Sequence, residues 1–62
     1  MKYILKHESG QYQLNLSSTI EEFRKRLEQK KDILTLFNLD GTYAGIENLS
    51  FLDECEIIKV DE

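Results

Sequence analysis

The chain has 62 residues, which is enough for one domain and too few for two. Apolar residues make up 40% of the sequence and proline is absent, so we expect one folded domain over residues 1–62 rather than a disordered segment. A single cysteine and a single histidine exclude an intramolecular disulfide and a zinc site built from Cys and His ligands.

The formal net charge of −4 is unevenly distributed, because the helix-forming segment is basic and the C-terminal third is acidic. This balance disfavours direct binding to the phosphates of a nucleic acid. No apolar stretch approaches the about 18–20 residues of a membrane span, and Met1 leads into a predicted strand rather than a signal peptide. Together with the unpaired thiol of Cys55, these features predict a cytoplasmic protein without a membrane partner.

Residues 2–6 and 11–16 alternate between two faces with the period of a β-strand. The short turn between them contains Gly10, which takes a positive φ without steric cost. We therefore predict an N-terminal β-hairpin. The face expected to point inward comprises Met1, Tyr3, Leu5, Tyr12, Leu14 and Leu16.

The spacing becomes helical after Ser18. Ile20, Phe23 and Leu27 are spaced i, i+3 and i+7, which places them on one stripe of a helix. Thr19 followed three residues later by Glu22 matches a capping box at a helix N-terminus. The sequence predicts a helix from about Thr19 to Lys30.

Three further strands are predicted over residues 33–39, 42–46 and 55–60, with a turn at Asp40-Gly41 between the first two. Residues 47–54 have no clean period, and we expect a loop that tucks Leu49, Phe51 and Leu52 under the sheet. The predicted fold class is α+β in the order ββαβββ, with a sheet of four to five strands packed on one helix.

This order of elements, with residues at matching positions, resembles the ubiquitin-like β-grasp family. The matching positions are Met1, Gly10, Thr19-Ile20-Glu21, Phe23, Leu27, Leu36-Phe37 and Leu49-Ser50. The segment Leu52-Asp53-Glu54 before a Cys-Glu-Ile-Ile strand also resembles the end of bacterial sulfur carriers, and the likeness extends to the ubiquitin-like proteins of type VII secretion.

The resemblance implies a mixed sheet in which the first and last strands are parallel and central. It does not carry over conjugation or sulfur transfer, because those activities use a C-terminal glycine pair and this sequence has no glycine after Gly45.

The alternation of side chains also predicts a second apolar face. Ile33, Phe37, Leu39, Cys55 and Ile57 are expected to point toward the helix. The opposite parity then comprises Ile4, Leu34, Leu36, Ile58 and Val60. With the β-grasp strand order these five residues form one patch, edged by Lys2, Lys6 and Gln13. Exposed apolar patches usually mark interaction sites, so we predict that this patch binds protein. The simpler alternative is that the central strands are apolar on both faces, or that loops cover them.

These features predict a non-enzymatic adaptor or regulatory module that binds another protein, or a second copy of itself as a homodimer, through the open face of the sheet. We expect no catalytic residue, cofactor or metal site. Cys55 is interpreted as a buried apolar thiol, and His7 as a solvated turn residue.

The alternative prediction is a small acidic inhibitor, of the kind carried by phages and mobile elements, that occupies a basic nucleic-acid-binding site on a target protein. Its contact surface would be the acidic edge formed by Asp53, Glu54, Glu56, Asp61 and Glu62.

Overall fold

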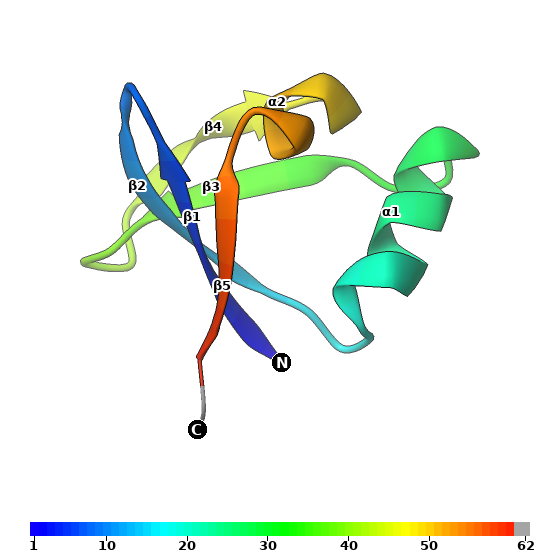
Figure 1. Cartoon of the computed structure of the whole chain (residues 1–62), viewed down its shortest axis with the longest axis horizontal. Helices are drawn as coiled ribbons and strands as arrows, with labels where there is room; N and C mark the ends of the chain where they lie inside the picture. The colour runs from blue at the N-terminus through cyan, green and yellow to red at the C-terminus, as the bar shows by residue number, and fades with distance from the viewer. Residues whose placement is uncertain (61–62) are drawn as a thin grey trace.

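The structure is a computed structural model, and it describes residues 1–60 of the chain. Asp61 and Glu62 of the predicted acidic edge lie outside the described residues. Within residues 1–60 the chain forms a five-stranded antiparallel sheet and two helices (Figure 1). The elements are β1 (Lys2–His7), β2 (Gly10–Asn15), α1 (Ile20–Glu28), β3 (Leu34–Asn38), β4 (Tyr43–Glu47), α2 (Leu49–Asp53) and β5 (Glu56–Val60). The α+β class is confirmed.

The predicted N-terminal hairpin is confirmed. β1 and β2 pair antiparallel from Lys2↔Asn15 to His7↔Gly10, and Gly10 adopts a φ of 151° directly after the turn. The Leu16 N–H donates to the Met1 carbonyl at 2.7 Å, which extends the pairing to the first residue.

Helix α1 begins where its capping residue predicts. The Thr19 hydroxyl accepts from the Glu22 N–H at 3.3 Å, and the Tyr3 hydroxyl accepts from the Ile20 N–H at the same distance. The helix ends at Glu28, shortly before the predicted boundary, and Lys30 takes a φ of 57° that no helix can continue. Phe23 and Leu27 are buried as expected, so the helical stripe is confirmed.

The strand order differs from the one that the ubiquitin-like resemblance implied. The observed order is β4-β3-β2-β1-β5, and β5 pairs antiparallel with β1, from Lys2↔Val60 to Lys6↔Glu56. The expectation of a mixed sheet with parallel, central first and last strands is therefore wrong: β1 has a neighbour on each side, but β5 is an edge strand. Residues 48–55 carry the chain from β4, at one edge of the sheet, to the far side of β1. There β5 pairs antiparallel with β1 and forms the opposite edge.

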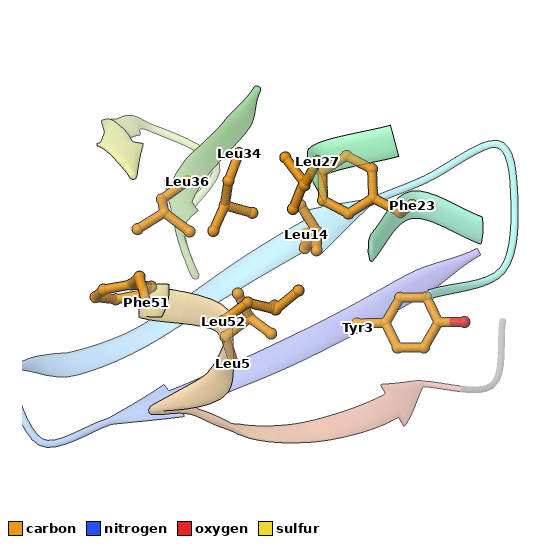
Figure 2. Close-up of a cluster of buried hydrophobic side chains, with 9 residues drawn as sticks. All are labelled: Tyr3, Leu5, Leu14, Phe23, Leu27, Leu34, Leu36, Phe51 and Leu52. Atoms are coloured by element: carbon orange, nitrogen blue, oxygen red, sulfur yellow. The ribbon is translucent and has the colours of Figure 1, made fainter. Parts of the chain in front are cut away.

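Residues 47–54 contain a short helix where the sequence predicted a loop. Helix α2 begins after Asn48, whose side-chain oxygen accepts from the Ser50 N–H at 3.1 Å. The expected inward tucking is confirmed, since Phe51 and Leu52 are buried. Their side chains join α1 and one face of the sheet in a single core, drawn in Figure 2. The core comprises Tyr3, Leu5, Leu14, Phe23, Leu27, Leu34, Leu36, Phe51 and Leu52.

The facing of β3 is opposite to the prediction. Leu34 and Leu36 are 0% and 3% exposed and belong to the core, whereas Ile33 and Leu39 are 60% and 53% exposed. The physical reason is visible in Figure 2, where Phe51 and Leu52 of α2 supply an apolar surface that the two leucines meet. Met1, also expected inside, is exposed as well.

Candidate protein-binding face

The structure places three of the five predicted binding residues on the outer face of the sheet, the face that points away from the two helices. Ile4 pairs with Ile58, and Val60 pairs with Lys2, while Tyr3 and Leu5 of opposite parity are buried in the core. Leu34 and Leu36 do not belong to this face, because they are core residues. The prediction that these two leucines contact a partner is therefore withdrawn.

The cross-strand pairs define a row of side chains that crosses all five strands. Ile58 pairs with Ile4, Ile4 with Gln13, Gln13 with Phe37, and Phe37 with Tyr43. Residues directly opposite each other in an antiparallel ladder project to the same side of the sheet. We call Ile58, Ile4, Gln13, Phe37 and Tyr43 the outer-face row.

The two aromatic members of the row were missed by the sequence reasoning. The rings of Phe37 and Tyr43 meet edge to face, with centroids 6.3 Å apart and an interplanar angle of 78°. Tyr43 is 61% exposed, and Ile46, which pairs with Thr35 on the same face, is 58% exposed. The turn signal at Asp40-Gly41 indicated a hairpin, but a two-residue turn there would set Phe37 opposite Ala44. The loop instead closes between Asn38 and Thr42, which brings Phe37 opposite Tyr43.

Gln13 lies in the middle of the row, although the sequence placed it at the edge of the patch. Its Nε2 donates to the Asn38 carbonyl at 2.9 Å, which holds the side chain across β2 and β3. Lys2 and Lys6 flank Ile4 on β1, as predicted, and Lys6 is paired with Glu56 of β5. The face is thus apolar along its centre, with one fixed amide and a lysine on either side.

Part of the acidic edge makes contacts within the molecule. Arg24 forms an ion pair with Asp53, and the Glu54 carboxylate lies 3.8 Å from the His7 Nε2. The Arg24–Asp53 ion pair reduces the free negative charge that a basic target would meet at this edge.

His7 is not the solvated turn residue that the sequence suggested. Its ring stacks on Phe51, with centroids 4.4 Å apart, and its side chain is 13% exposed. The reason is that β1 continues through His7, which brings the ring over the end of the core.

Cys55 has the surroundings of a structural thiol. Its Sγ–H donates to the Phe51 carbonyl at 3.2 Å. Burial, and then the nearby Glu54 carboxylate, raise the pKa of the Cys55 thiol, so it is protonated at neutral pH.

Among residues 1–60, no three His, Cys, Asp or Glu side chains gather closely enough to hold a metal ion. None of the helices in that part of the chain has the length and apolar character to cross a bilayer.

Comparison of the chain with models of protein families, with curated proteins and with solved structures gives no match. The geometry of the outer face is therefore the basis for assigning a function.

Proposed function

We propose that this protein is a non-enzymatic adaptor or regulatory module that binds another protein, or a second copy of itself, through the outer face of the sheet. The observation that supports this is the outer-face row, which spans β5, β1, β2, β3 and β4 without interruption. We place the binding in the cytoplasm, on the ground that the single cysteine is a free thiol.

The composition of the row suits a protein partner. Aromatic residues are enriched at protein interfaces, and Tyr43 and Phe37 form a ready aromatic pair at one end of the row. Ile46 and Ile58 add exposed aliphatic surface, and Lys2 and Lys6 supply a polar rim. Soluble monomers rarely expose contiguous apolar patches beyond a few hundred Å² unless they use them.

Affinity capture from native host cells tests this proposal with three variants. Ile58→Lys and Tyr43→Lys each put a charge into the row, while Gln29→Lys adds the same charge at the exposed end of α1. We expect wild type and Gln29→Lys to capture the same partner, or to self-associate equally in solution, and the two row variants to lose that binding. Equal capture by all three folded variants would remove the proposal.

The acidic-inhibitor alternative remains a second proposal with a different signature. Binding through the acidic edge weakens steeply with added salt, and Glu54→Lys abolishes it. Binding through the outer-face row is nearly insensitive to salt and responds to Ile58→Lys instead. Membership of the ubiquitin-like family stays a prediction of the sequence, and neither proposal depends on it.

A further inference from the structure

The ladder between β2 and β3 is short, although both strands continue beyond it. They pair at Tyr12↔Asn38 and Gln13↔Phe37 and then separate toward α1, as Figure 1 shows. A pocket of ≈ 220 Å³ lies at this separation. We call this opening the β2–β3 gap. Its lining comprises Leu14, Asn15, Leu16, Ser17, Phe23, Arg26, Asp32, Ile33, Thr35 and Phe37.

The backbone of β2 turns toward the gap at Asn15, which pairs with Lys2 of β1 but has no ladder partner on β3. Leu16 exchanges two hydrogen bonds with Met1, one from each N–H, so its backbone faces β1. Hydrogen-bonding direction alternates along an antiparallel strand. The N–H and C=O of Asn15 therefore point to the other side, toward β3.

The backbone of β3 does the same from the opposite side. The Asn38 N–H donates to the Thr42 carbonyl at 2.8 Å, so Asn38 faces the β4 side. By the same alternation, Phe37 and Thr35 face β2. In the register of Gln13↔Phe37, Asn15 and Thr35 would be the next hydrogen-bonded pair, but the ladder stops before them. Two donors and two acceptors of the main chain thus face the β2–β3 gap.

The remaining lining of the gap is apolar at its floor and polar at its side. Leu14 and Phe23 are buried core residues. The Arg26 Nε is buried and has no hydrogen-bond partner among residues 1–60, although it lies 3.3 Å from Asp32 Oδ2. Because Arg26 and Asp32 carry opposite charges, the gap favours neither an anion nor a cation.

A neutral ligand with donors and acceptors in alternation fits these groups, and a polypeptide backbone is such a ligand. Successive residues of an extended chain direct their N–H and C=O groups to opposite sides, so one residue can bond to Asn15 and the next to Thr35. The volume of ≈ 220 Å³ lies below the about 300–1,000 Å³ of a typical small-molecule pocket, which favours a single apolar side chain over a whole cofactor.

We propose that the β2–β3 gap receives an extended segment of a protein partner, which hydrogen-bonds to the backbone of Asn15 and Thr35 and places one apolar side chain over Leu14 and Phe23. This inference rests on the proposed function and specifies the chemistry of the partner. The gap adjoins the outer-face row at Phe37, so one partner can occupy both.

The test is a selection of randomised linear peptides, about twelve residues long, against the full chain, because strand addition requires only an extended backbone and one suitable side chain. The bound and free proteins are then compared by amide hydrogen exchange. We expect the amides of Asn15 and Thr35 to exchange at least about tenfold more slowly in the complex, because each gains a backbone hydrogen bond.

Two tryptophan variants provide the matched control. Ser17→Trp places a bulky ring at the lining of the gap, while Gln29→Trp places the same ring at the exposed C-cap of α1. Peptide affinity should fall at least about tenfold for the first and stay unchanged for the second.

Peptides that bind but leave Asn15 and Thr35 unprotected, and that respond to Ile58→Lys rather than Ser17→Trp, would overturn this inference while the proposed function stands. A selection that yields no binding peptide also overturns it, and the capture experiment then decides the proposed function separately.

Discussion

The Cys55 thiol shows how one residue's surroundings set its chemistry. Its raised pKa means that the folded protein holds the thiol proton more tightly than the unfolded chain does. The associated stability is present below the thiol pKa of the unfolded chain and is lost as the pH rises through the folded value. We expect a thiol-reactive disulfide reagent to label Cys55 more slowly in native protein than in denaturant at the same mildly alkaline pH. Glu54→Gln should speed native labelling, and equal native and denatured rates would contradict this account.

The pKa of Asp40 is shifted in the opposite direction, downward. The Asp40 Oδ1 accepts from the Thr42 hydroxyl at 2.6 Å and from the Thr42 N–H at 2.9 Å, and these bonds lower the pKa of the carboxyl from its usual value. The stability that they contribute is present above the unfolded pKa and is lost as the pH falls through the folded one. Asp40→Ala should lower the thermal midpoint at neutral pH, and the difference from wild type should shrink in acid. A difference that stays constant down to pH about 2 would show that the ionised carboxylate is not responsible.

At the scale of elements, α2 was the main feature that sequence periodicity did not predict. A five-residue helix is too short to display a helical period, and its buried side chains are consecutive in sequence. The local signal was Asn48, whose preference for the N-cap position comes from its short side-chain oxygen. Asn48→Ala should lower the free energy of unfolding by about 1 kcal/mol in denaturant titrations, whereas Asn48→Asp, which keeps the acceptor, should cost much less.

The inverted facing of β3 follows from α2. Both parities of residues 33–39 are apolar, so alternation alone does not choose between them. The choice is made by Phe51 and Leu52, which come from a helix that the sequence did not show. β1, β2 and α1 were predictable because one face of each is clearly more apolar than the other; in β1 the opposite face carries Lys2 and Lys6 beside Ile4. The same error brought Leu34 and Leu36 into the predicted binding patch and left Phe37 out of it.

The facing of β3 predicts a contrast between two truncations on the same strand segment. Leu36→Ala removes a core side chain and should cost about 2–5 kcal/mol of unfolding free energy. Ile33→Ala removes an exposed side chain of similar size and should change stability by no more than about 0.5 kcal/mol. A larger loss of unfolding free energy for Ile33→Ala than for Leu36→Ala in urea titrations would support the facing of this strand that the sequence predicted.

At the scale of the whole molecule, the periodicity of side chains does not predict the direction in which a strand runs. The periodicity of residues 55–60 indicates a strand but says nothing about its neighbour or its direction, and the parallel pairing came only with the ubiquitin-like resemblance. The antiparallel entry of β5 beside β1 sets Ile58 directly opposite Ile4. Without that register, the outer-face row ends at Ile4 and the proposed binding surface loses one edge.

The measurement that tests this arrangement most directly is a nuclear Overhauser experiment on the full chain in solution. Because the backbone of Tyr3 and Leu5 faces β2, their pairs with β5 are not hydrogen-bonded, and such pairs bring two Cα atoms to about 4.5 Å. We predict strong contacts between the Hα atoms of Tyr3 and Lys59 and between those of Leu5 and Ile57. Contacts that instead place β5 parallel to β1 would contradict the outer-face row and the binding surface built on it.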